Sequence, residues 1–160
     1  MTTFSRSQIL RAITLLLRIA LGGIFVYAAW SKLKDPWALF AMAIDSYQVL
    51  PIWAVEWLAR TLPWLELWIG AMLIVGRWMR IATAATSLLL LVFFSLMVRA
   101  RVLGIEINCG CFGPGEAISW KTLLRDGAML AGSLLLTLVT FAAKLAPRAE
   151  IQYDHVADEQ

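Results

Sequence analysis

The chain has 160 residues, of which 61% are hydrophobic and only 16% are charged, against about a quarter charged in an ordinary soluble domain. A soluble domain of this size could not bury so much apolar surface, because small domains keep a large surface relative to their volume. The formal net charge of +3 comes from scattered basic residues, so nucleic-acid binding is not indicated. The composition excludes a soluble enzyme, a disordered chain and a β-rich secreted module, and it predicts a small integral membrane protein in contact with the lipid bilayer.

Four apolar stretches, at about 9–30, 53–76, 78–98 and 120–143, are each long enough to cross a bilayer, which takes about 20 helical residues. Segment 37–44, between the first two, is predicted as a short interfacial helix. The second and third stretches are joined only by Gly76, Arg77 and Trp78, so they must be antiparallel neighbours. We therefore predict an all-α membrane protein, a four-transmembrane-helix bundle over 1–146 with both termini on one side. A flexible polar tail is expected over 147–160.

The basic residues give a modest topology signal. One face would carry Arg6, Arg11, Arg77, Arg80, Lys144 and Arg148, and the other Lys32, Lys34, Arg99, Arg101 and Lys121. Cytoplasmic loops of membrane proteins carry an excess of lysine and arginine. The small excess on the first face predicts a multi-pass protein of the inner (plasma) membrane with cytoplasmic termini and with the two longer connections outside.

The strongest chemical signal is the pair Cys109 and Cys111, the only cysteines, which are separated by Gly110. A disulfide across one residue closes a tight ring, and strained bridges exchange readily. This spacing favours a dithiol/disulfide pair on the outer face, the catalytic site of a candidate thiol–disulfide oxidoreductase. Two structural thiols are the alternative. A metal site is a weaker one, since two thiolates supply half of a tetrahedral zinc site, and no metal is predicted.

Ionisable residues within the spans are costly and usually face the bundle interior or a partner. The candidates here are Arg18, Arg60, Glu66, Arg125 and Asp126. If Trp30 and Trp53 both mark the outer interface, Arg18 lies about 18 Å and Glu66 about 20 Å below it, at 1.5 Å per residue. We therefore predict an Arg18–Glu66 ion pair and, by the same reasoning, a second pair between Arg60 and Asp126.

Two interpretations of these charges stay open. The pairs could simply fasten helices together, or they could line a polar pocket beneath the cysteine segment for a quinone headgroup or a proton path. Nothing in the sequence specifies a quinone, which is the one cofactor considered.

Several stretches resemble the MauE (methylamine utilisation) group within the wider DoxX-like family of redox-associated membrane proteins. They are 18–22 (RIALG), 31–36 (SKLKDP), 47–51 (YQVLP), 62–66 (LPWLE), 109–113 (CGCFG), 118–120 (ISW) and 124–126 (LRD). The first is typical of the broad family, whereas the CGCFG stretch before the last helix is more specific to the MauE-like branch.

The resemblance implies a four-helix membrane bundle with a redox accessory role. It suggests maturation of a periplasmic enzyme such as methylamine dehydrogenase, alongside a thioredoxin-like or client partner. Cys109 and Cys111 would be the redox pair, while Arg18, Glu66, Arg125 and Asp126 match family-like positions without an assigned role. Two other functions remain in competition, a non-catalytic membrane scaffold or assembly subunit and a quinone-linked oxidoreductase subunit.

Overall fold

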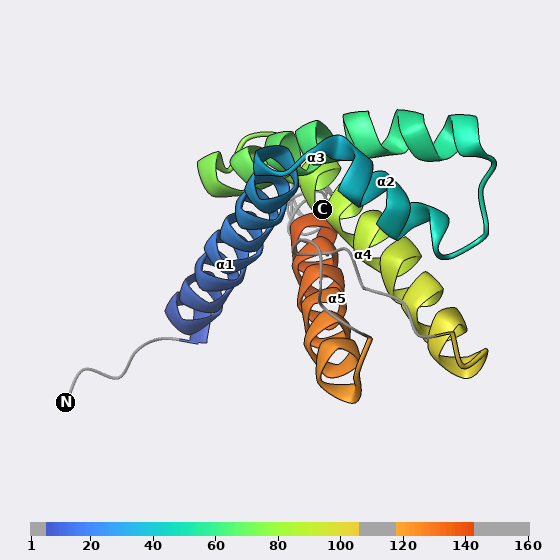
Figure 1. The fold of residues 1–160 in the computed structure, drawn as a ribbon. Coiled ribbons are helices and arrows are strands. Elements are labelled where there is room, and N and C mark those ends of the chain that lie inside the picture. The colour runs from blue at the N-terminus through green and yellow to red at the C-terminus, as the bar shows by residue number, and fades with distance from the viewer. Residues whose placement is uncertain (1–5, 106–117, 143–160) are drawn as a thin grey trace, which may run out of the picture.

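The computed structural model describes residues 6–105 and 118–142, and the regular secondary structure of this part of the chain is all α-helix. Its helices are α1 (Arg6–Lys34), α2 (Trp37–Asp45), α3 (Ile52–Val75), α4 (Met79–Val102) and α5 (Trp120–Ala142). In the view of Figure 1, α3 runs across the top and α1, α5 and α4 extend below it. All but α2 are long and apolar enough to cross a membrane. The predicted all-α, four-span membrane fold is confirmed, while the predicted tail over 147–160 lies outside the described residues.

Proline and glycine set the element boundaries between α1 and α4. Pro36 and Pro51 directly precede α2 and α3, and a residue before proline is disfavoured in helical conformation. Gly76 ends α3 with a positive φ of 79° and donates its N–H to the Met72 carbonyl, a conformation that suits glycine because it has no Cβ. The predicted short helix after the first span and the very short turn after the second are both confirmed.

Close contact between α1 and α3 depends on two glycines. A Cβ placed on Gly70 would lie 2.9 Å from the Gly22 carbonyl oxygen, and one on Gly22 would lie 3.0 Å from the Gly70 oxygen. Small residues let helix backbones approach closely in lipid. Arg18, early in α1, lies beside Gly76 at the end of α3, whereas Lys32, late in α1, forms an ion pair with Glu66. The two helices are therefore antiparallel, with Gly22 opposite Gly70.

The seam between α4 and α5 is lined with hydroxyl groups. Ser87 Oγ lies 3.2 Å from Ser133 Oγ and 3.0 Å from Thr137 Oγ1, and the Thr83 and Thr140 hydroxyls are 3.3 Å apart. Hydrogen bonds of this kind hold helices together where lipid offers no hydrophobic drive for association. The pairing is antiparallel, so the end of α5 lies at the start of α4, at the same end of the bundle as the Gly76 turn.

The core joins these two helix pairs. It contains Leu21, Phe25, Ile69, Leu73, Ala82 and Leu136, which come from all four long helices. Short α2 packs on α3 instead, with Phe40 against Ala59 and Leu62. Many large apolar side chains on the long helices point outward and stay exposed, as expected for helices that face lipid.

Candidate functional site

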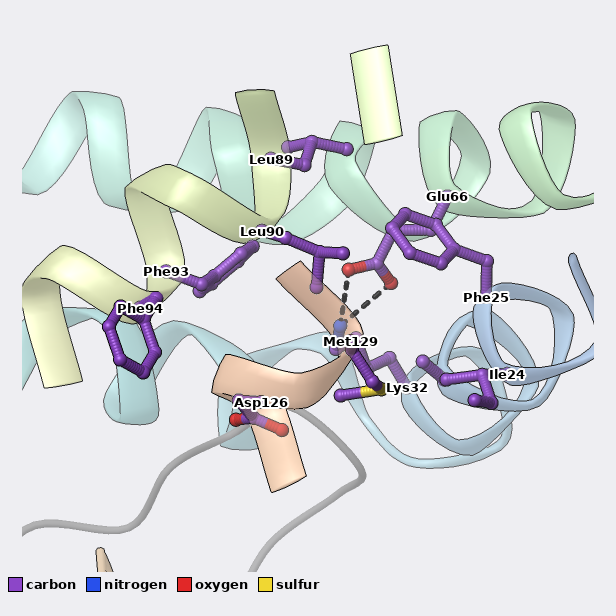
Figure 2. Close-up of a pocket in the computed structure, with 11 residues that line it drawn as sticks. Ile24, Phe25, Lys32, Glu66, Leu89, Leu90, Phe93, Phe94, Asp126 and Met129 are labelled. Carbon is purple, nitrogen blue, oxygen red and sulfur yellow. Dashed lines mark hydrogen bonds and ion pairs between the residues drawn. The ribbon is translucent and has the colours of Figure 1, made fainter. Parts of the chain in front are cut away.

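A buried ion pair lies near the end of α1. Lys32 Nζ is 2.6 Å from Glu66 Oε1 and 2.7 Å from Oε2, and the two side chains are only 2% and 7% exposed. Figure 2 shows the ammonium between both carboxylate oxygens. Removing two charges from water is costly and is offset only by good geometry with further interactions, so this pair is a strong local constraint on the packing of α1 against α3.

Aromatic rings complete the surroundings of the ammonium. Lys32 Nζ lies 4.9 Å from the ring centroid of Phe40 on α2 and 5.7 Å from that of Phe93 on α4. The negative face of an aromatic ring attracts a cation, most strongly where both are out of water. One lysine on α1 thus contacts α2, α3 and α4.

A small cavity of about 40 Å³ adjoins the pair, which is enough space for water. Its lining comes from α1, α3, α4 and α5: Ile24, Phe25, Ala28, Lys32, Glu66, Leu89, Leu90, Phe93, Phe94, Asp126 and Met129. The three ionisable members are Lys32, Glu66 and Asp126, and Figure 2 shows Asp126 reaching the cavity from a different helix than Glu66. The site is therefore an apolar cavity with one ammonium and two carboxylates.

Asp126 is positioned by the first turns of α5. Ser119 and Thr122 bond reciprocally there: the Thr122 N–H donates to Ser119 Oγ at 3.3 Å and the Ser119 N–H donates to Thr122 Oγ1 at 2.7 Å. Such side-chain contacts satisfy N–H groups that a helix start leaves unpaired. Arg125 Nε donates to Asp126 Oδ1 at 2.9 Å; the Asp126 side chain is 6% exposed and that of Arg125 is 36% exposed.

The predicted Arg18–Glu66 pair is wrong, because Glu66 pairs with Lys32. Since Gly22 lies opposite Gly70, Arg18 lies beside the C-terminal end of α3, about two to three helical turns from the level of Glu66. There Arg18 Nη2 lies 3.5 Å from the Ile74 carbonyl oxygen. The error came from treating Trp30 and Trp53 as markers of one depth.

The predicted Arg60–Asp126 pair is wrong as well. The Arg60 guanidinium carbon lies 4.3 Å from the ring centroid of Trp37 on α2, whereas Asp126 accepts a hydrogen bond from Arg125, the preceding residue. Arg60 thus joins α3 to α2 and does not reach α5.

Lys32 is the residue that the sequence reasoning missed. A first span that ends near residue 30 leaves Lys32 in the connection that follows, yet α1 continues to Lys34. Its spacing from Phe25 and Ala28, both buried, places Lys32 on the same helix face. That periodicity could have indicated an inward-facing lysine.

Cys109 and Cys111 lie outside the described residues, but both flanks of their segment are described. Buried Met97 near the end of α4 packs with buried Leu123 near the start of α5, and Ile118 packs against them. The Arg101 guanidinium lies 5.7 Å from the ring centroid of Trp120. The helix ends that precede and follow the cysteine segment are therefore held together at one end of the bundle.

The four apolar spans and the buried polar centre define a multi-pass membrane protein of the helix-bundle class. Within that class, the family described as methylamine utilisation protein MauE matches residues 10–139, and the chain belongs to this family. Methylamine utilization protein MauE of Paracoccus denitrificans is 33% identical over 123 residues, an alignment that covers 75% of this chain and 66% of the relative. The chain thus spans just under two thirds of that relative's length. No solved structure matches it.

Proposed function

We propose that the protein exchanges thiols and disulfides with an extracytoplasmic partner through Cys109 and Cys111. The observation that carries the proposal is the position of this cysteine pair. It lies in the connection between α4 and α5, where Met97 and Leu123 hold the flanking helix ends together. The two helix ends that flank the cysteine pair are thus fixed at one end of the bundle.

The exchange needs no external oxidant. A thiolate of one cysteine attacks a sulfur of the partner's disulfide, which forms a mixed disulfide and releases one partner thiolate. The second cysteine then attacks the mixed disulfide, so that Cys109 and Cys111 become oxidised and the partner leaves as a dithiol. The reverse sequence oxidises the partner and leaves both cysteines reduced.

Four basic residues belong to the helix ends that flank the segment, and a cation that neighbours a thiol stabilises the thiolate that such an attack requires. Arg99 and Arg101 belong to the last turn of α4, and Lys121 and Arg125 to the first turns of α5. Arg99 Nη1 also donates to the Tyr47 carbonyl at 3.2 Å, which ties this end of α4 to the chain after α2.

Membership of the MauE family supports a client in methylamine metabolism. The proposed client is a periplasmic enzyme such as methylamine dehydrogenase, reached directly or through a thioredoxin-like protein. In this arrangement the protein lies in the inner membrane with cytoplasmic termini, and the cysteine segment faces the periplasm.

Thiol trapping in intact cells tests the proposal. A membrane-impermeant maleimide that adds mass, applied before and after reduction, should report a reversible Cys109–Cys111 disulfide labelled from outside. A Cys111→Ser variant should then capture the partner on Cys109, and the Cys109→Ser/Cys111→Ser double variant should capture nothing. If both thiols stay permanently reduced and the double variant retains full function, the protein is instead a scaffold without chemistry of its own.

A further inference from the structure

Arg18 places a permanent positive charge within the first span, and little balances it there. The span covers Leu10–Lys34, and the next residue, Ile19, is apolar and exposed. Arg18 Nε is buried without a hydrogen-bond partner among the described residues, and Nη2 lies 3.5 Å from the Ile74 carbonyl oxygen, which is long for a hydrogen bond. Charged groups within a span are costly and mark places where a partner or an ion is bound.

The helix end beside Arg18 does not neutralise its charge. A Cβ on Gly76 would lie 2.7 Å from Arg18 Nη1, so the guanidinium lies against the last turn of α3. A helix C-terminus offers about half an elementary negative charge, whereas Arg77, the next residue in the turn, is exposed and adds a full positive one. The acidic residue of α3 nearest to Gly76 is Glu66, about 15 Å away along the helix, and Lys32 already pairs with it.

The other described carboxylates lie toward the opposite end of the bundle. They follow α1, end α2 or belong to the first turns of α3 and α5: Asp35, Asp45, Glu56 and Asp126. The end that contains the Gly76 turn has a third cation instead, Arg80, whose guanidinium lies 5.0 Å from the ring centroid of Phe141 at the end of α5. Within the described part of the chain, this end of the bundle is therefore a cationic surface without a carboxylate.

Two tryptophans beside the turn indicate where this surface lies in the bilayer. The rings of Trp68 and Trp78 meet edge to face with their centroids 6.5 Å apart, and Trp78 is 61% exposed. Tryptophan side chains collect at the level of the lipid headgroups, because the indole ring is amphipathic. The charges of Arg18 and Arg77 thus lie where the phosphates of lipids are found.

We propose that the Gly76 turn is a binding site for the phosphate group of an anionic phospholipid, held by Arg18 and Arg77. A guanidinium matches the geometry of phosphate with two parallel hydrogen bonds, and basic pockets between transmembrane helices bind acidic lipid headgroups. Exposed Ile19 on α1 and exposed Val75 on α3 give the acyl chains an apolar surface beside the charges. No thiol takes part, so this inference does not depend on the proposed disulfide exchange.

Native mass spectrometry of the full chain in detergent micelles tests this site. The probes are dioctanoyl phosphatidylglycerol, the zwitterionic dioctanoyl phosphatidylcholine, and glycerol 3-phosphate, which has no acyl chain. We expect phosphatidylglycerol to bind about tenfold more tightly than phosphatidylcholine, because two arginines attract its net charge, and glycerol 3-phosphate to bind far more weakly. Equal affinity for the two lipids would overturn the proposal, and glycerol 3-phosphate binding as tightly as phosphatidylglycerol would assign the site to a soluble phosphate instead.

Substitutions locate the lipid on the protein. Arg18→Gln should weaken phosphatidylglycerol binding about tenfold, since a charge-assisted contact is lost, and Arg18→Lys should weaken it less, because the charge remains without the paired hydrogen bonds. Arg11→Gln removes an exposed arginine from the same end of α1 and is the matched control. If Arg11→Gln weakens binding as much as Arg18→Gln, the lipid is attracted by the basic surface in general and the site is wrong.

Two further variants keep the test decisive. Arg77→Gln changes an exposed position and should also weaken phosphatidylglycerol binding, so the test stands even if Arg18→Gln does not fold. The chain's own C-terminal acids are the competing occupant, and all four are neutralised in Glu150→Gln/Asp154→Asn/Asp158→Asn/Glu159→Gln. This variant should bind the lipid as the native chain does. Lipid binding that appears only in this variant would mean that those carboxylates occupy the arginines, and the proposal would fail.

Discussion

Lys32 carries its charge into the buried face of α1, and Glu66 is the group that balances it. Removing either partner leaves an uncompensated buried charge, which costs about 3–5 kcal/mol. We expect Lys32→Met to lower the free energy of unfolding by about that amount, and Lys32→Met/Glu66→Met to recover most of it. Denaturant unfolding in micelles, followed by tryptophan fluorescence, measures both. Lys34→Met, at an exposed position two residues on, is the control; an equal loss there would contradict the assignment.

Gly76 is constrained both by its own backbone conformation and by the Arg18 side chain from another helix. Its φ is 79°, and a Cβ there would lie 2.7 Å from Arg18 Nη1. The left-handed conformation alone costs a non-glycine residue about 1–2 kcal/mol. We expect Gly76→Ala to destabilise the protein by more than Gly104→Ala, since Gly104 has φ 67° but no atom within 4 Å of its Cβ position. Equal losses in thermal unfolding would mean that Arg18 adds no constraint.

At the level of elements, the Gly22–Gly70 contact sets how closely α1 and α3 approach. A Cβ on Gly70 meets backbone atoms of α1 at 2.9 and 3.0 Å, and backbone cannot rotate away as a side chain can. We expect Gly70→Ala to cost about 1–3 kcal/mol through overpacking. The neighbouring Gly23→Ala should be neutral or stabilising, because nothing lies within 4 Å of its Cβ position and alanine favours a helix interior. Comparable losses in the two variants would disprove this contact.

For the whole molecule, the arrangement of spans places the Arg77 turn and the cysteine segment at opposite ends of α4. With 24 residues, α4 is about 36 Å long, enough to cross a hydrocarbon core of about 30 Å. In a Cys109→Ser/Cys111→Ser background, we expect Arg77→Cys to react with an impermeant maleimide only after the membrane is permeabilised, whereas the native cysteines react from outside after reduction. Labelling of both from the same side would rule out this topology.

Much of the architecture followed from the sequence alone. The four spans, the short helix after Pro36 and the turn at Gly76 are local properties: continuous apolar length, the restriction that proline imposes and the freedom of glycine. Each is encoded within a few neighbouring residues or one helix. The sequence also predicts that Glu66 and Asp126 face the interior of the bundle, because exposing a charged group to lipid is costly.

The partners of those charges were decided only in the tertiary structure. The cation that reaches Glu66 depends on the register of α1 along α3. The Gly22–Gly70 contact sets this register, and the depth of the tryptophans does not indicate it. Similarly, the α2–α3 packing holds Arg60 over Trp37. The sequence by itself determined which segments cross the membrane and which groups are polar within them. Only the tertiary structure decided the ion pairs and the cavity, because backbone contact between helices distant in the chain sets the register.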